Sequence, residues 1–297
     1  MPNSPSADNL EWTVLRVLQW ATGYLKAREV ESPRAAAEIL LAHVLHVQRL
    51  ELYLRHDQPL VPAELSKFKD AIRRRLRREP VAYIVGRKGF WTLDLRVTPE
   101  VLIPRPETEL LVEQALAVLK AHPDLAGARV LELGIGSGAV VIALATEANR
   151  SRFFGCDISP GAVALAQANA IASGVSERVR FWAADWFAGV KPGCRFDLIV
   201  SNPPYVRRAE IGTLQPEVSG HEPRLALDGG PDGLQSFRAI LSAAPGHLAP
   251  GGSLVLEIGS GQRGAIRQLA EESGGYGDLD SRRDYAGHDR VIILRKK

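Results

Sequence analysis

The sequence predicts an α/β protein with a mostly parallel sheet, preceded by a small all-α domain and a β-hairpin connector. From about residue 129 onward, short apolar segments alternate with helical segments, which is typical of a parallel sheet. Residues 10–80 instead carry apolar side chains at helical spacing. Residues 81–105 hold β-branched and aromatic residues around two glycines, as in a hairpin. The expected domains are therefore 1–80, 81–105 and 106–297.

The composition indicates a globular protein of one large or two ordinary domains, because 45% of its 297 residues are apolar and 24% are charged. Its two cysteines, Cys156 and Cys194, have no metal-ligand spacing. We therefore expect neither a disulfide scaffold nor a metal site, and we expect a cytoplasmic location. Residues 1–12 show no signal-peptide pattern, and the longest apolar tract, Val130–Ala145, is interrupted by Glu132, so no membrane association is expected.

Positive charge gathers in the N-terminal part of the chain. Residues 1–90 contain 15 Lys/Arg and 10 Asp/Glu, whereas the whole chain has a net charge of only +3. Much of the excess lies in the arginine run Arg73–Arg78. A solvated basic helix face is the favoured interpretation, and docking of an acidic or RNA-associated partner is the alternative.

The first domain is predicted to contain helices over residues 12–25, from Pro33 to Leu45, around residues 50–54 and from Pro62 to Arg78. Ser32 followed by Pro33 is read as an N-cap and a first-turn proline. Residues 81–85 and 90–97 are read as strand segments. Pro106 then opens a helix that runs from Glu107 to Lys120.

The remaining chain predicts alternating strands and helices, with the last two strands antiparallel. The expected strands are Arg129–Leu133, Arg152–Asp157, Val179–Ala183, Phe196–Ser201, Gly252–Glu257, 278–285 and Arg290–Arg295. The expected helices are Ala139–Glu147, Pro160–Ala172 and Leu234–Ala243.

A glycine-rich turn after the first of these strands predicts a nucleotide-type cofactor site. Glycines let the backbone pass close to a ligand, and a carboxylate at the end of the next strand suits a ribose diol. After the third strand, an acid and an indole suit an adenine amino group and ring. The candidate cofactor residues are Glu132, Gly134, Ile135, Gly136, Ser137, Gly138, Asp157, Asp185 and Trp186.

Two kinds of cofactor fit this turn. The spacing Gly134-x-Gly136-x-x-Ala139 also matches the dinucleotide fingerprint. Glu132 before the turn instead favours a cationic ligand, such as a sulfonium methyl donor, which needs no pyrophosphate cradle. Trp186 is read either as a cofactor contact or as core packing.

The segment Asn202-Pro203-Pro204-Tyr205 follows a buried strand and forms a stiff loop, because the two prolines fix successive φ values. It presents two carbonyl acceptors and an aromatic face, which suit a planar group that carries an NH2. We therefore predict that Asn202, Pro203 and Tyr205 act in methyl transfer to nitrogen, and that Asn202 also contacts the cofactor. Orientation of the amide supplies the main catalytic effect.

Together these motifs resemble class I S-adenosylmethionine-dependent methyltransferases that act on planar nitrogen. The stretches Arg78–Ile84, Leu102–Glu109, His221–Gly230 and Leu256–Gly259 are similar to the bacterial peptide chain release factor glutamine methyltransferases (the HemK/PrmC group). The resemblance covers about residues 10–297. Glu132 stands where the family usually has aspartate, and His221 where an aromatic residue is common.

The resemblance implies a Rossmann-like, seven-stranded catalytic domain and an N-terminal domain that binds the substrate. It implies N5-methylation, with S-adenosyl-L-methionine as donor, of the glutamine in the Gly-Gly-Gln motif of release factors. Phe90 and Asn202–Tyr205 then hold that glutamine. We expect a monomer that contacts no nucleic acid directly.

Three other functions remain as alternatives. An amino-methyltransferase acting on adenine shares the Asn-Pro-Pro-Tyr loop, but it needs base extrusion and a basic, aromatic-interleaved region. A dinucleotide-dependent oxidoreductase has no use for the acceptor loop. An adaptor without catalysis needs none of the cofactor positions. Among single residues, His221 is read as structural, Cys156 as a small buried residue, and Glu257 as satisfying backbone donors.

Overall fold

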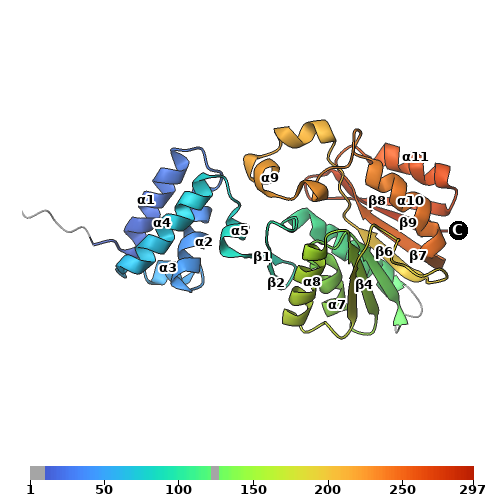
Figure 1. Ribbon diagram of the computed structural model, residues 1–297, viewed down its shortest axis with the longest axis horizontal. Coiled ribbons are helices and arrows are strands. Elements are labelled where there is room, and N and C mark those ends of the chain that lie inside the picture. The colour runs from blue at the N-terminus through green and yellow to red at the C-terminus, as the bar shows by residue number, and fades with distance from the viewer. Residues whose placement is uncertain (1–10, 122–126) are drawn as a thin grey trace, which may run out of the picture. The chain divides into compact units, whose positions relative to one another are not determined.

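The computed structural model describes residues 11–121 and 127–297, which form two compact units (Figure 1). The smaller unit extends to Gly86 and also includes Pro216–His221, and the larger unit comprises Arg87–Gln215 and Glu222–Lys297. Residues 1–10, where no signal peptide is predicted, lie outside the described residues. None of the described helices combines the length and the apolar character needed to cross a membrane.

The smaller unit is helical. Its core consists of apolar side chains that recur at helical spacing, such as Leu25, Leu40 and Phe68. Pro33 occupies the first turn as predicted, but Ser32 adopts φ 48° and its side chain makes no capping hydrogen bond. The helices of this unit are α1 (Val14–Lys26), α2 (Pro33–Leu45), α3 (Glu51–Leu54), α4 (Pro62–Leu76), α5 (Val81–Val85) and α9 (Pro216–His221).

Residues 81–85, which the β-branched pattern assigned to a strand, form helix α5, so that prediction was wrong. The amides of Tyr83 and Ile84 both donate to the carbonyl of Pro80, which opens the helix, and Gly86 ends it at φ 74°. Ile84 is buried in the helical core. Packing against neighbouring helices therefore overrides the local β-propensity of a five-residue segment.

The arginine run at the end of α4 is more than a solvated basic face. Arg75 is only 4% exposed and forms an ion pair of 2.7 Å with Glu217 of α9. Arg74 pairs with Glu79 at 2.5 Å, and Arg78 donates to two carbonyls in the loop after α1. Arg75 and Arg78 thus stabilise their own unit, whereas Arg73, Arg74 and Arg77 are exposed, as the interpretation favoured from the sequence expects.

The larger unit contains a seven-stranded sheet in the order β5-β4-β3-β6-β7-β9-β8 within the described residues. The first five strands in this order are parallel, and β9 and β8 are antiparallel, as predicted. The strands are β3 (Arg129–Leu133), β4 (Arg152–Asp157), β5 (Val179–Ala183), β6 (Phe196–Ser201), β7 (Leu248–Glu257), β8 (Tyr276–Arg283) and β9 (Asp289–Lys296). A separate antiparallel pair is formed by β1 (Arg87–Phe90) and β2 (Leu93–Arg96).

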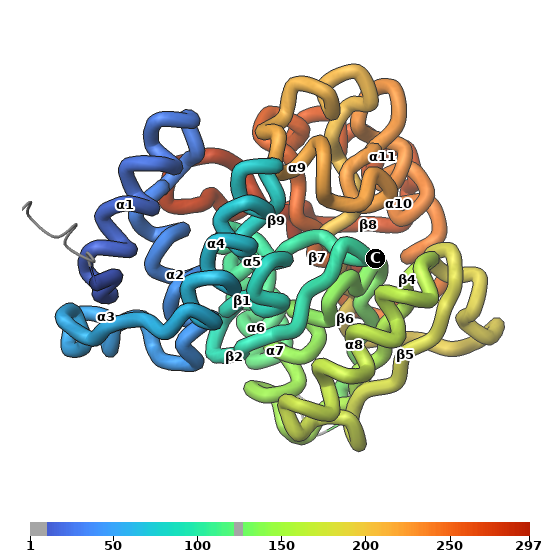
Figure 2. The backbone as a smooth tube through the Cα atoms, turned by 60° about the vertical axis from the view of Figure 1, so that its left-hand side comes forward, coloured from blue at the N-terminus to red at the C-terminus, as the bar shows by residue number. Residues whose placement is uncertain are grey.

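Helices cover both faces of the sheet. Alternate residues of each strand point to opposite faces, so Val130 joins the core under α6 and α7, whereas Leu131 joins the core under α10 and α11. Figures 1 and 2 both show α10 beside α11. The helices are α6 (Glu109–Ala121), α7 (Ala139–Glu147), α8 (Pro160–Ala172), α10 (Gln235–His247) and α11 (Arg263–Ser273), with 3-10 turns η1 (Pro106–Thr108), η3 (Arg208–Thr213) and η4 (Arg224–Ala226). The sequence predicted these α-helices except α11.

The chain reverses its winding direction between β3 and β6. From β3 it proceeds to β4 and β5 on one side, and β6 then returns to the other side of β3. At their carboxyl ends, the Ser201 hydroxyl donates to the Leu133 carbonyl over 2.7 Å. Ligands of open α/β sheets bind at such a switch point, because the loops diverge there.

The first prediction concerns the buried ion pair of the helical unit. Glu217→Ala leaves the Arg75 guanidinium buried without its carboxylate, so the free energy of unfolding should fall by about 3–5 kcal/mol. The matched control is Arg73→Ala, which removes an exposed pair with Asp70 and should cost about 0–1 kcal/mol. Urea unfolding of both variants measures the difference, and equal effects would contradict a structural role for Arg75.

Candidate active site

A cavity of about 680 Å³ lies at the carboxyl ends of the parallel strands, within the larger unit. Its volume is in the range of small-molecule sites. Every residue predicted to contact the cofactor, with the exception of Gly138, lines it: Glu132, Gly134, Ile135, Gly136, Ser137, Asp157, Asp185, Trp186 and Asn202. The sheet topology therefore brings together residues that lie up to 70 positions apart, from Glu132 to Asn202.

The glycine-rich turn is anchored to the end of β4. The amides of Gly134 and Ile135 both donate to the carbonyl of Cys156. Gly138, at φ 81°, serves packing: a Cβ there would lie 2.9 Å from Ile142 Cδ1 and 3.1 Å from Ala166 Cβ. Its glycine allows α7 to approach α8 closely, which places the turn without a direct contact to the cavity.

Asp157 orients the turn from the neighbouring strand. One of its carboxylate oxygens accepts the Gly136 amide and the other accepts the Ser159 amide, each at 2.9 Å. The carboxylate also lines the cavity. Its position is therefore fixed by backbone donors, and lone pairs remain for a ligand, because a carboxylate accepts up to about four hydrogen bonds.

Glu132 is 2% exposed and caps α7, the helix that follows the turn. One carboxylate oxygen accepts the Val141 amide of α7 at 2.8 Å. Burial, with a smaller contribution from Asp157, raises the pKa of Glu132 well above its ordinary value. Since the Glu132 side chain already accepts an amide in the first turn of α7, this terminus is a poor site for a pyrophosphate.

Acidic side chains dominate the charged part of the cavity wall. Five carboxylates line it, whereas Arg105 is the one Lys/Arg side chain among the lining residues of the described chain. The acids are Glu100, Glu132, Asp157, Asp185 and Asp228. This arrangement favours a cationic ligand over a dinucleotide.

The turn after β5 supports both interpretations of Trp186. Its ring lines the cavity and also packs against the core beneath α10. Its backbone adopts φ 45°, and its carbonyl accepts a hydrogen bond from Cys156 Sγ over 3.1 Å. Cys156 is buried as predicted, and burial raises the pKa of its thiol to about 12. Asp185 is exposed at the mouth of the cavity.

The acceptor loop contributes Asn202 and Pro204 to the cavity wall. The amide nitrogen of Asn202 donates to the Thr108 hydroxyl over 3.2 Å. Pro203 is buried and Tyr205 is half-buried against the core, and neither belongs to the wall. Of the two residues proposed to supply carbonyl acceptors, Asn202 thus lines the cavity and Pro203 does not.

The loop is supported from behind by two distant segments. The amide nitrogen of Gln262 donates to the carbonyls of Tyr205 and Gly233, each over 3.1 Å. A Cβ on Gly229 would lie 2.9 Å from the Pro204 carbonyl oxygen and from Gly233 Cα. The backbone behind the acceptor loop is therefore packed too closely for any other residue at position 229.

Two residues singled out from the sequence lie elsewhere. Phe90 is 2% exposed in the core beneath β1 and does not line the cavity. His221 belongs to the helical unit, where its Nε2 lies 2.9 Å from the Arg77 carbonyl oxygen. That contact agrees with the structural role predicted for His221.

Sequence reasoning missed two side chains that shape the cavity. Glu222 is buried and accepts from the Ile103 amide (3.2 Å) and from Arg105 (2.5 Å), which fixes the wall before η1. Asn169 on α8 donates to the Ser137 carbonyl over 2.9 Å and so holds the glycine turn. Neither had a distinctive local signal, because Asn169 shares its helix with Gln167 and Glu222 stands beside His221.

The chain matches two family models. The model described as PrmC N-terminal domain matches residues 16–86, and that described as Methyltransferase small domain matches residues 107–216. Among solved structures, a methyltransferase from Pyrococcus furiosus has a TM-score of 0.50 at 20% identity, covering 77% of this chain and 98% of that one. The hMettl16 catalytic domain in complex with an MAT2A 3′UTR hairpin has a TM-score of 0.55 at 12% identity, covering 68% and 75%. These likenesses confirm the methyltransferase fold.

Curated relatives match over nearly the full length. The release factor glutamine methyltransferase of Geobacter sulfurreducens is 44% identical, covering 95% of this chain and 96% of its own. That of Rhodopirellula baltica is 38% identical, covering 98% and 99%. With this identity over nearly its whole length, the chain belongs to the release factor glutamine methyltransferase family.

Proposed function

We propose that this protein transfers a methyl group from S-adenosyl-L-methionine to the side-chain amide nitrogen of the glutamine in the Gly-Gly-Gln motif of peptide chain release factors. One observation carries the proposal. At the sheet's switch point, the NH2 of Asn202 is committed to Thr108, beside a cavity lined by carboxylates. The carbonyl oxygen of Asn202 is therefore the group that can accept a hydrogen bond from the NH2 of a substrate.

The cavity suits the donor in charge and shape. S-Adenosylmethionine supplies a methyl group on a positively charged sulfur, which the carboxylate-rich wall favours. Asp157 accepts from the ribose hydroxyls, while Asp185 and Trp186 receive the adenine amino group and ring. The turn Gly134–Gly138, held by Asn169 and by the β4 carbonyl, keeps the backbone close to the ligand.

The acceptor loop orients the glutamine amide. Its nitrogen is a weak nucleophile, because the lone pair is delocalised into the carbonyl. The Asn202 side-chain carbonyl and the Pro203 backbone carbonyl accept its two N–H bonds and fix the direction of attack. The ring of Tyr205 packs beside the amide. Burial raises the pKa of Tyr205 to about 12, so its phenol stays protonated, and the proton of the methylated nitrogen leaves to water.

The helical unit supplies the binding surface for the release factor in this proposal. Several of its large apolar side chains are exposed, among them Trp12 (40%), Trp20 (38%), Leu50 (71%) and Leu54 (77%). Of these, the rings of Trp12 and Trp20 lie 6.2 Å apart, and exposed apolar side chains that lie together favour a protein partner. The reaction needs neither a nucleic acid nor a second copy of the chain, and its substrate belongs to the cytoplasm.

Mass spectrometry tests the substrate directly. The purified protein, labelled S-adenosylmethionine and a release factor should give a single added methyl group on the glutamine of the Gly-Gly-Gln motif. A release factor with that glutamine replaced by asparagine is the matched control and should stay unlabelled. Adenine-containing DNA and RNA oligonucleotides form the second arm, and labelling of these alone would transfer the activity to the adenine amino group.

The second prediction concerns the donor. Asp157→Ala removes charge-assisted hydrogen bonds to the ribose, so S-adenosylmethionine binding should weaken by about 1–3 kcal/mol. Asp157→Asn, which keeps acceptor capacity for the turn, should weaken it less. Isothermal titration calorimetry measures both variants, and NAD serves as the competing ligand. Tight NAD binding with no response to S-adenosylmethionine would reverse the assignment.

The third prediction concerns Asn202. Asn202→Ala removes one of the two positioning acceptors, so the single-turnover rate at saturating donor should fall about 10²–10³-fold. Asn202→Asp should be equally poor, because it loses the donor to Thr108. Tyr205→Phe should be mild, since the proposal uses the ring and not the hydroxyl. Wild-type turnover by Asn202→Ala, with unchanged donor affinity, would remove Asn202 from the mechanism.

A further inference from the structure

Glu257 is a buried carboxylate next to the acceptor loop that the mechanism above does not use. It is the last residue of β7 and is 1% exposed. In the parallel pair of β6 and β7, Ser201 lies opposite Leu256, so Glu257 and Asn202 leave the sheet side by side. The sequence suggested that Glu257 satisfies backbone donors, but its hydrogen bonds come from the side chains of Thr108 and Asn202.

These side chains form a hydrogen-bond network that ends on the Glu257 carboxylate. Asn202 donates to Thr108 Oγ1 over 3.2 Å, and Thr108, 5% exposed, is in turn hydrogen-bonded to Glu257. A hydroxyl that accepts from an amide has its own proton free, and a carboxylate can only accept. Glu257 therefore accepts from the Asn202 amide both directly and through the Thr108 hydroxyl. The charge at the end determines which side of the Asn202 amide faces Thr108.

We propose that Glu257 is a positioning residue, which acts directly and through Thr108 to hold the Asn202 amide with its carbonyl oxygen toward the methyl acceptor. The inference rests on the proposed function of Asn202. A lone structural carboxylate needs partners for both oxygens, whereas Glu257 Oε2 has no hydrogen-bond partner in the described part of the chain. The hydrogen bonds therefore orient Thr108 and Asn202, whereas they leave one oxygen of Glu257 without a partner in the described residues.

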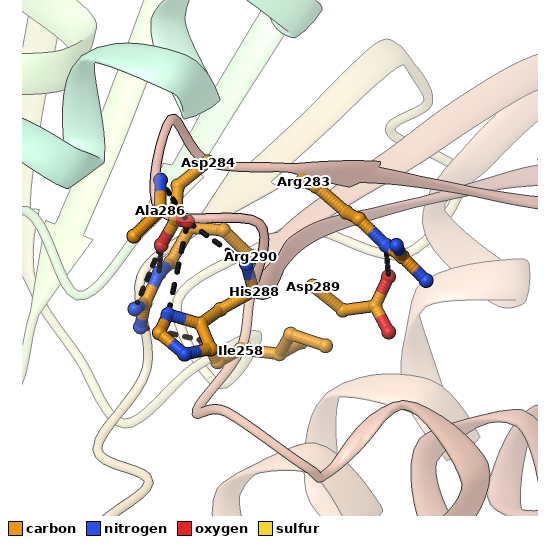
Figure 3. Close-up of polar contacts among 7 residues, drawn as sticks. All are labelled: Ile258, Arg283, Asp284, Ala286, His288, Asp289 and Arg290. Atoms are coloured by element: carbon orange, nitrogen blue, oxygen red, sulfur yellow. Dashed lines mark hydrogen bonds and ion pairs between the residues drawn. The ribbon is translucent and has the colours of Figure 1, made fainter.

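The surrounding charges leave this carboxylate close to its protonation point. Burial raises the pKa of Glu257 to about 7, the nearby Glu107 of η1 acts in the same direction, and Arg290 of β9 opposes them. Arg290 is itself held by Asp284, and it donates to the Ile258 carbonyl over 3.3 Å (Figure 3). Tyr205 of the acceptor loop also faces Glu257, and it stays protonated.

Protonation would reverse the chain of hydrogen bonds. A protonated Glu257 donates to Thr108, whose hydroxyl then donates onward, and its acceptor is the Asn202 carbonyl oxygen once the amide has rotated. The rotated amide presents NH2 to the NH2 of the substrate, and two donors repel. Activity should therefore rise with pH through about 7 and level off above it.

The fourth prediction tests this role by kinetics and by double mutants. Glu257→Leu and Thr108→Val should each lower the single-turnover rate about 10–100-fold, as is typical for groups that orient a reacting residue. Donor affinity and the melting temperature serve as controls for folding. Glu257→Gln should lose the pH dependence. Thr108→Ser keeps the hydroxyl and should therefore retain the rate that Thr108→Val loses. In an Asn202→Ala background, Glu257→Leu should have no additional effect. Additive losses in the double mutant would exclude an action through Asn202.

A second measurement needs neither substrate nor donor. The side-chain NH2 resonances of Asn202, identified by their loss in Asn202→Ala, should titrate with a midpoint near pH 7 in the wild-type protein and stay constant in Glu257→Gln. Titration that persists in Glu257→Gln, or none in the wild type, would overturn the positioning role. A titration without methylation of any release factor would instead count against the proposed function alone.

Discussion

The hydrogen bond between Ser201 and Leu133 marks the constraint on which the rest of the site depends. It joins the carboxyl ends of β3 and β6, the two strands between which the chain reverses its direction of winding. The loops that leave these strands must diverge, and the space between them is the cavity. The glycine turn and the acceptor loop therefore begin on adjacent strands. In the proposed function, the cofactor contacts the turn after β3 and the substrate amide contacts the loop after β6.

The charge of the cavity follows from the same geometry. β3 carries Glu132 and β4 ends in Asp157, so two carboxylates lie beside the first turn of α7. Burying Glu132 is unfavourable for its charged form, and the Val141 amide offsets part of this cost. In return, the helix terminus that could bind a phosphate is already occupied.

Local patterns predicted four of the parallel strands well, because these are short segments bounded by polar or glycine-rich turns, whereas β7 begins at Leu248 and not at the predicted Gly252. β3, β4, β5 and β6 begin and end where the pattern placed them. The strand prediction was wrong for the short segment α5, because tertiary packing determines its secondary structure. Long-range pairs were not predictable: Arg75 meets Glu217 across 142 positions, and Asn202 meets Thr108 across 94. Phe90 was assigned by resemblance, whereas its burial depends on packing that no local pattern encodes.

The rigidity of the acceptor loop explains why so many distant residues converge on it. An amide nitrogen gains reactivity mainly from being oriented, so a loop free to move would lose the effect that it supplies. Thr108 fixes Asn202 from one side, while Gln262 and Gly229 fix the backbone from the other. All of these residues belong to the larger unit, whereas the exposed Trp12 and Trp20 belong to the smaller one. In the proposed function, binding of the partner and orientation of its glutamine reside in separate parts of the chain. Substitutions on α1 should consequently change the affinity for the release factor, whereas substitutions around Asn202 should change the rate of the chemical step.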